Sequence, residues 1–598
     1  MKKIITLIIA ILPLIAISQE DEYTLAMSYY NNQEYKKAAP IFWQLYKERK
    51  MKYLYDYYII SLIKAEEYNK ALKIAKKEAK KHNQRAQYLI TLGYVYKISG
   101  NTTKSKKEYS NAIKNMKGTI AEVNEVAQNF IRFGEFKWAE KAYIKGKKLT
   151  NYTFLYEMAN LYDIWRMYDK MIDCYLDLIK ENIKNYSTAK NVFTTHLYRE
   201  NSGEFASILE LKLIERIQKD DYFAYRKLLI WFYLQEGNIQ EALIQAKAYD
   251  KKLKNGGVMT YEVGLAAQKS KKYDLAQEAF NYIINQWKHS PYYWKAKFGI
   301  LNTKYNYIKN NSNPDSSELF SLAQEYLNII NELGINKKTK PILLQYCHLE
   351  AFYIHNYSKA IEILDKTIKM RELKPNEKGQ FMIEKADILV AANQLWAAIL
   401  LYAKVQEEFR GKEIADEAAF KKAKTYFYLG KFKWAKSQFD ILKGSSTKLT
   451  ANDAIYYSFF INENISEDST QTALKLYAQA DRYIFARYFD SALILIDTIL
   501  TKFPMSRIID DALWLKYKIY FEQHNYKKAV EALEKILTNY SGSILTDKAL
   551  YFSGVLYQDY LHNTAKAGEY YKELLINYKD SFYISEARKR YRKIIENK

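Results

Sequence analysis

The chain has 598 residues, a hydrophobic content of 48% and a formal net charge of +24. This length exceeds what one compact core supports, and the hydrophobic content excludes wholesale disorder, so the sequence predicts several domains or one extended array. Only 19 glycines and 7 prolines interrupt it, which favours helices joined by short turns over a β-sandwich or barrel.

The first 18 residues, MKKIITLIIAILPLIAIS, predict a secretory signal peptide. Two lysines precede an apolar run (4–17) that is too short to cross a bilayer, and small residues follow where a cleavage site would lie. We therefore expect an exported, periplasmic protein, or one peripheral to the outer membrane, with no transmembrane span after cleavage. A retained N-terminal anchor is the alternative. Nucleic acid, which the basic charge would suggest in the cytosol, is not an expected partner here.

A phrase that begins at residue 134 is nearly repeated at residue 430. GEFKWAEKAY (134–143) and GKFKWAKSQF (430–439) place Ala139 and Ala435 in the same setting, after a turn and an aromatic residue. This setting recurs at Ala38, Ala71, Ala276, Ala360, Ala492 and Ala529, and more weakly at Ser105, Met171, Ala206, Ala242, Ala323, Ala398 and Ala567. In the first half of the chain these anchor positions are 32 to 36 residues apart. Small anchors flanked by large residues predict pairs of closely packed helices.

A period near 34 with spaced small and large positions, such as Phe130, Ala139 and Tyr143, resembles the tetratricopeptide repeat. The resemblance implies an all-α, right-handed α-solenoid of about fifteen helix–turn–helix units. The segments TKFPMSRIIDDALW, TNYSGSILTDKALY and INYKDSFYISEARKRY near the C-terminus are similar to repeat boundaries in bacterial envelope proteins. Those proteins are the outer-membrane β-barrel assembly lipoprotein and the cell-division coordinator of the Tol–Pal system.

Two steps between successive anchors, of 47 and 57 residues, are longer than one repeat. We expect the first to contain a polar loop at 309–318. The second should contain an extra helix around 450–462 and then a polar segment at 462–471. These interruptions predict three arrays after the signal peptide (1–18), at 19–305, 306–449 and 450–598.

No constellation of residues in the sequence predicts catalysis. Cys174 and Cys347 are far apart and lack any metal-binding spacing. His355 and His524 both precede Asn-Tyr-x-Lys-Ala, which predicts a role in the turns between helices. The Ser-x-x-Lys match at 445–448 lacks its companion motifs. We therefore expect a protein that is not an enzyme, with no cofactor and no metal.

The resemblance to tetratricopeptide repeats implies a partner-binding surface lined by the first helix of each repeat. Taking Gly93, Ala159, Ala423 and Tyr517 as the eighth repeat position, the partner-facing fifth, ninth and twelfth positions are Ile90, Tyr94, Lys97, Tyr156, Asn160, Asp163, Phe420, Lys424, Phe427, Trp514, Lys518 and Phe521. Aromatic residues beside lysines suit an anionic or amphipathic partner. Packing on neighbouring repeats is the alternative for each. These positions lack the Lys and Asn pair that chaperone-binding members use to clamp a carboxylate.

Positive charge is concentrated between Lys64 and Lys117, where 14 basic and 4 acidic residues leave a charge of +10. The predicted basic face consists of Lys73, Lys76, Lys77, Lys80, Lys104, Lys106 and Lys107. A solvated convex surface is one interpretation. The other is contact with anionic lipid, glycan or an acidic protein, which salt would weaken.

These patterns favour a non-catalytic scaffold for protein–protein interactions in a bacterial envelope complex, such as secretion or outer-membrane assembly machinery. The composition and the leader are typical of a Bacteroidota-like bacterium. The alternative hypothesis is a binding module for an anionic envelope polymer, namely peptidoglycan, lipopolysaccharide or an exported polysaccharide, which would bind through the basic face.

Overall fold

The computed structural model describes residues 22–199, 203–310, 314–444, 448–465 and 471–596. These residues form helices and turns without a β-strand, so the predicted all-α fold is confirmed. The helices divide into two units, Met1–Gln245 (unit 1) and Ala246–Lys598 (unit 2). The predicted signal peptide lies outside the described residues.

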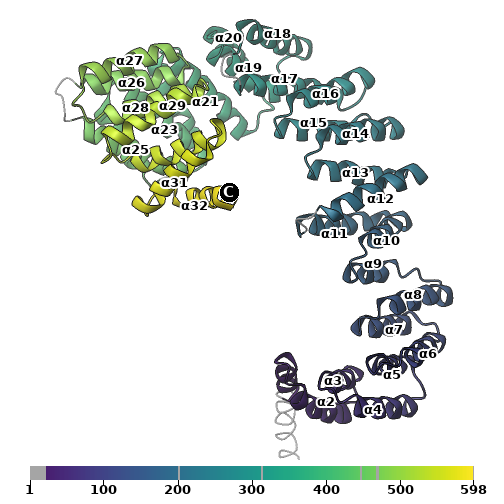
Figure 1. Cartoon of the computed structure of the whole chain (residues 1–598). Coiled ribbons are helices and arrows are strands. Elements are labelled where there is room, and N and C mark those ends of the chain that lie inside the picture. The colour runs from purple at the N-terminus through teal and green to yellow at the C-terminus, as the bar shows by residue number, and fades with distance from the viewer. Residues whose placement is uncertain (1–21, 200–202, 311–313, 445–447, 466–470, 597–598) are drawn as a thin grey trace, which may run out of the picture. The chain divides into compact units, whose positions relative to one another are not determined.

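Successive helices in each unit form pairs joined by short turns (Figure 1). After a helix at residues 22–31, unit 1 contains α2 (Tyr35–Arg49), α3 (Lys52–Lys64), α4 (Tyr68–Lys81), α5 (Ala86–Ile98), α6 (Thr102–Lys114), α7 (Ile120–Arg132), α8 (Phe136–Thr150), α9 (Leu155–Ile164), α10 (Tyr168–Glu181), η1 (Ile183–Asn185), α11 (Tyr186–Arg199), α12 (Glu204–Asp220) and α13 (Phe223–Gln235). Helix α14 (Ile239–Leu253) begins in unit 1 and ends in unit 2.

Unit 2 continues the pairs with the same kind of turn. It contains α15 (Val258–Lys269), α16 (Tyr273–Gln286), α17 (Tyr293–Lys309), α18 (Ser316–Leu333), α19 (Lys340–Phe352), α20 (Tyr357–Ile368), α21 (Pro375–Ala391), α22 (Leu395–Glu408), α23 (Glu413–Tyr428), α24 (Phe432–Leu442), α25 (Lys448–Asn464), α26 (Thr472–Phe485), α27 (Phe489–Lys502), α28 (Ile509–Glu522), α29 (Tyr526–Asn539), α30 (Thr546–Val555), η2 (Leu556–Tyr560), α31 (Thr564–Asn577) and α32 (Ile584–Glu596). None of the helices in the described part of the chain is both long enough and apolar enough to cross a membrane.

The turn from the first to the second helix of a repeat contains a residue with left-handed backbone. Gly134 and Gly430, which open the two similar phrases, have φ of 70° and 71°. A glycine adopts this conformation without the Cβ strain of other residues. His355 and His524 occupy the same place in their repeats, with φ of 61° and 53°. Their predicted role in turns is confirmed.

The anchor alanines lie where the two helices of a repeat pack together. Ala139 and Ala435 have no exposed surface, and neither do the other strong anchors, Ala38, Ala71, Ala276, Ala360, Ala492 and Ala529. The two phrases are therefore alike because they solve the same packing problem. Ala206 differs, since it is half-buried and its neighbour Phe205 is buried instead.

The first interruption of the period contains less loop than expected. Helix α17 extends to Lys309, and α18 already begins at Ser316, where the Asp315 carboxylate accepts a hydrogen bond from the Ser317 amide (3.4 Å). The predicted polar loop is therefore wrong at 316–318. The extra helix expected around 450–462 is confirmed as α25. The three predicted arrays stay a prediction.

Unit 2 folds back so that helices distant in sequence come into contact. The Tyr357 hydroxyl donates a hydrogen bond to that of Tyr488, 131 residues further along, at 3.0 Å. The His355 ring stacks on Tyr488 (4.3 Å between centroids), and Phe352 packs edge-on against Phe485. A regular solenoid has contacts between neighbouring repeats only. Here α21, α23, α26 and α28 gather into one group, seen in the green part of Figure 1.

Candidate functional site

Four first helices of unit 2 present alternating charges at the ninth repeat position. These residues are Asp387 on α21, Lys424 on α23, Asp481 on α26 and Lys518 on α28, and we call them the charge ladder. Each lies eleven residues before the anchor of its repeat, Ala398, Ala435, Ala492 or Ala529. The ladder therefore follows from the repeat register, which places equivalent side chains on one face of stacked first helices.

Two carboxylates of the ladder are satisfied by neighbours on adjacent helices. Asp387 forms an ion pair with Lys421 (2.6 Å) and accepts a hydrogen bond from Tyr402. Asp481 forms an ion pair with Lys424 (3.2 Å). Burial opposes the ionisation of Asp481, but the Lys424 ammonium lowers its pKa below the ordinary value.

Two tyrosines, one on α23 and one on α25, complete the shell around Asp481. The Tyr428 hydroxyl donates to its carboxylate at 3.3 Å, and the Tyr457 hydroxyl of α25 donates at 3.1 Å. The inserted helix α25 thus contacts the ladder directly. Its aromatic side chains fill part of the space between α23 and α26.

Lys518 ends the ladder without an ion pair of its own in the described part of the chain, although the more distant Asp481 carboxylate attracts it. In the described ranges no carboxylate lies within ion-pair distance of its ammonium. The side chain is exposed, yet the surrounding helices replace much of the bulk water around it, and this desolvation lowers the pKa of Lys518. Nearby Lys548 on α30 is half-buried, lies 4.4 Å over the Trp514 ring, and has a pKa that burial also lowers.

A buried carboxyl group lies on the same helix as Lys518. Asp511 is 8% exposed and accepts a hydrogen bond from the Tyr456 hydroxyl of α25 (2.8 Å). Burial, together with the neighbouring Asp510 charge, raises the pKa of Asp511 to about 8. The group is therefore mainly protonated at neutral pH.

Asp511→Asn is expected to stabilise unit 2 more at pH 9 than at pH 5. Because the folded-state pKa is about 8 and an unfolded aspartate has a pKa of about 3.9, the folded state holds the extra proton between these values. Stability is therefore lost as pH rises through this window, and asparagine removes that loss. Thermal unfolding of both proteins at the two pH values measures it; an equal effect at pH 5 and pH 9 would contradict the raised pKa.

A pocket of about 350 Å³ lies beside the ladder, within unit 2. It is lined by residues of α19, α21, α28 and the α26–α27 turn, among them Phe352, Phe485, Arg487, Lys518 and Phe521. Repeats that are not consecutive build it, because the fold-back brings α19 to the α26–α27 turn. Sequence reasoning found Lys518 and Phe521 but missed Phe352, Phe485 and Arg487.

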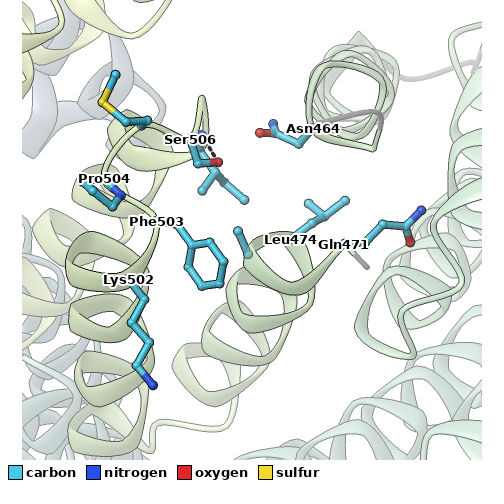
Figure 2. A pocket seen from close by; sticks show the side chains of 10 residues that line it. Asn464, Gln471, Leu474, Lys502, Phe503, Pro504 and Ser506 are labelled. Carbon is cyan, nitrogen blue, oxygen red and sulfur yellow. Dashed lines mark hydrogen bonds between the residues drawn. The ribbon is translucent and has the colours of Figure 1, made fainter. Parts of the chain in front are cut away.

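A second pocket, of about 420 Å³, lies between α26 and the turn after α27. Figure 2 shows Phe503, Leu474 and Pro504 at its wall, together with Asn464 and Gln471. Since residues 466–470, which follow Asn464 and precede Gln471 in the sequence, lie outside the described ranges, we assign this pocket no role.

Three predicted partner-binding residues are buried, and their assignment is wrong. Ile90 has no exposed surface and belongs to the core of unit 1. Phe427 is enclosed by α25 and α26 through Tyr457, Phe460 and Tyr477. Trp514 is 4% exposed, because Phe552 and Lys548 of the next repeat cover it.

The other predicted positions of unit 1 reach the surface to different degrees. Tyr156 and Asn160 are exposed. Tyr94 is half-buried against Phe133 (4.5 Å), and Lys97 forms an ion pair with Glu135 (2.6 Å). Asp163 lies 3.2 Å from the His196 ring. Their role in binding stays a prediction, as does that of half-buried Phe420 in unit 2.

The lysines of the predicted basic face lie on the second helices α4 and α6, and all seven are exposed. Within the described ranges none of the seven forms an ion pair with a carboxylate. Lys76 and Lys104 approach the same ring, that of Tyr96, at 5.7 and 5.9 Å. Helices α4 and α6 thus both present exposed lysines, and Tyr96 lies near one lysine of each helix.

The cysteines and the possible metal ligands of the described residues do not gather into a cluster of three or more. Cys174 and Cys347 are buried and free, and burial raises the pKa of the Cys174 thiol to about 12. Across the described ranges no cluster of three or more His, Cys, Asp or Glu residues could hold a metal ion. Residues 445–447 of the Ser-x-x-Lys match (445–448) lie outside the described ranges, and Lys448 begins α25.

The chain is an all-α solenoid of tetratricopeptide-like repeats, as its own helices and their contacts define. No family model matches the sequence, and no curated protein matches it. A tetratricopeptide repeat protein from Parabacteroides merdae is 12% identical over 52% of this chain and 98% of that chain, with a TM-score of 0.28. Yeast Tom70 is 12% identical over 76% and 98%, with a TM-score of 0.28. Cut9, in the APC/C hetero-tetramer Cut9-Hcn1, is 12% identical over 98% of both chains, with a TM-score of 0.22.

Proposed function

We propose that this protein is a non-catalytic, exported scaffold that binds a protein partner in a bacterial envelope complex, such as secretion or outer-membrane assembly machinery. Export rests on the sequence of residues 1–18. Binding rests on the first-helix face of unit 2, where stacked helices present a pocket with aromatic walls beside charged side chains.

One observation carries the scaffold proposal. Lys518 is charged, partly desolvated and without an ion pair at the end of a ladder whose other members are paired. A charge held in such surroundings costs free energy that a partner of opposite charge recovers. The unpaired Lys518 is therefore better explained by association with a partner than by a contribution to folding alone.

A pull-down of the tagged mature protein from gently solubilised cell envelope tests the scaffold proposal. We expect one discrete protein partner to be retained at both low and high salt, because a desolvated contact is screened less than a surface contact. Capture of no protein at either salt concentration would overturn the proposal.

The basic face supports a second candidate function, the binding of an anionic envelope polymer. Its seven lysines are exposed and lack ion pairs in the described structure. Binding would then depend on salt. In the same pull-down, a variant with Lys73, Lys76, Lys104 and Lys107 replaced by Gln separates the two functions. If glycan or lipid is no longer captured by this variant, or by the unmodified protein in high salt, polymer binding is favoured. If the variant captures the same protein partner as the unmodified protein, the scaffold function is favoured.

A further inference from the structure

We propose that the pocket between α19, α21, α26 and α28 binds a partner segment that presents a carboxylate beside a large apolar side chain. The carboxylate would pair with Lys518, and the apolar side chain would occupy the aromatic part of the pocket. This inference rests on the proposed scaffold function and specifies the chemistry of its ligand.

The walls of the pocket are suited to one large apolar side chain. Phe352, Ile484, Phe485, Phe489 and Phe521 line it. Its volume of about 350 Å³ is near the lower end of the usual range for ligand pockets, which is about 300–1,000 Å³. Phe485 is held by its edge-on contact with Phe352 at 5.5 Å, so the wall is pre-formed and a ligand need not order it.

Among the charged groups that line the pocket, one cation has no ion pair in the described structure. Besides Lys518, the acidic and basic residues that line it are His348, Asp387, Arg487 and Glu522, and each has a partner at short distance. The pairs are His348 with Glu384 (3.0 Å), Arg487 with Glu522 (3.3 Å) and Asp387 with Lys421 (2.6 Å). Lys518 remains without a carboxylate in the described ranges, so the charge complement of the pocket is an anion.

The position of Lys518 favours a protruding chain over a flat surface. Helices on several sides desolvate its ammonium, and the electrostatic neighbours that it meets lie on α23, α26, α28 and α30: Lys424, Asp481, Asp511 and Lys548. Hydrophilic sugars do not suit the phenylalanine walls beside Lys518. An extended peptide can place an acidic residue and its apolar neighbour there.

Fluorescence anisotropy with two labelled peptides tests this inference on the full chain. One peptide alternates aspartate and phenylalanine, and the other alternates asparagine and phenylalanine. We expect the first to bind and the second to bind at least about tenfold more weakly, since a hydrogen bond to a charged group is lost. The substitution Lys518→Gln should weaken the binding of the aspartate peptide by a similar factor. The control is Lys535→Gln, because Lys535 is an exposed lysine on the second helix of the same repeat. Its affinity for the aspartate peptide should stay within about twofold of that of the unmodified protein.

Three results would overturn the inference. The aspartate peptide fails to bind, or it binds Lys518→Gln as tightly as the unmodified protein, or Lys518 instead determines binding to phosphatidylglycerol vesicles. Hydrogen exchange of α28 is the control that Lys518→Gln remains folded. Phe521→Ala removes part of the apolar wall and tests its contribution to peptide binding independently of Lys518. If the pull-down partner is retained by Lys518→Gln, the scaffold proposal stands while the pocket is excluded as its binding site.

Discussion

Asp56→Asn is expected to lower the free energy of unfolding of the α3–α5–α7 region by about 3–5 kcal/mol. The Asp56 carboxylate is 1% exposed and connects three successive first helices. It pairs with Lys52 on its own helix, accepts a hydrogen bond from Thr91 of α5 (2.9 Å) and pairs with Arg132 of α7 (2.6 Å). Asparagine leaves the half-buried Lys52 ammonium without its counter-charge.

Hydrogen exchange followed by mass spectrometry measures this loss, because it reports the opening of individual repeats. Peptides from α3, α5 and α7 should lose protection together. Asp220→Asn is the matched control in unit 1, since Asp220 pairs with Lys180 at the exposed surface, and its cost should stay below about 1 kcal/mol. Unchanged protection in all three helices of Asp56→Asn would show that the ion cluster does not hold them together.

Phe280→Ala is expected to cost about 3–5 kcal/mol in unit 2, because it leaves a cavity between α15, α16 and α17. The ring has no exposed surface. It lies between Gly264 and Gly299, where an added Cβ would come within 2.7 and 2.8 Å of ring atoms. The two glycines thus allow first helices to approach a ring on the second helix between them.

A double-mutant cycle separates this packing from a general loss of hydrophobicity. Gly264→Ala alone should destabilise, because its methyl group meets the Phe280 ring. In the Phe280→Ala background the same change should cost less, since the cavity accepts the methyl group. Thermal unfolding measures both effects, with Phe320→Ala as control because Phe320 is 60% exposed. Strictly additive effects would mean that the two positions do not touch.

The repeat, its turns and its anchors could be predicted because they depend on contacts close in sequence. The two helices that Ala139 separates are neighbours in the chain, and so are those at Ala435. The left-handed turn at His355 or His524 is a local requirement of the same kind. The helix pair and the turn of each repeat can therefore be predicted from the sequence of that repeat.

The candidate binding face of unit 2 was predicted less well than the repeat, because its exposure depends on contacts between distant repeats. The periodic register assumed a regular solenoid, in which the twelfth position faces solvent. In unit 2 the inserted helix α25 covers Phe427, and the fold-back joins Tyr357 to Tyr488. The 57-residue step predicts the inserted helix but not the residues that it covers, and the fold-back does not change the period, so the pocket could not be found from spacing.

Part of the charge ladder was nevertheless within reach of the sequence. The register that selected Lys424 and Lys518 selects Asp387 and Asp481 when it is applied to the repeats of Ala398 and Ala492. Alternation of acidic and basic residues at one repeat position then predicts pairing between neighbours. Which lysine would remain unpaired depends on side-chain distances, and the sequence does not contain these.

Site-specific photo-crosslinking in the cell envelope tests most directly whether the first-helix face of unit 2 binds a protein partner. A benzophenone amino acid in place of Phe521 lies in the pocket wall, and the same probe in place of Phe582, which is 87% exposed, samples a surface outside it. We predict one discrete cross-linked protein from position 521 and none of that protein from position 582. No cross-link from 521, or the same products from both positions, would contradict the scaffold function of this face.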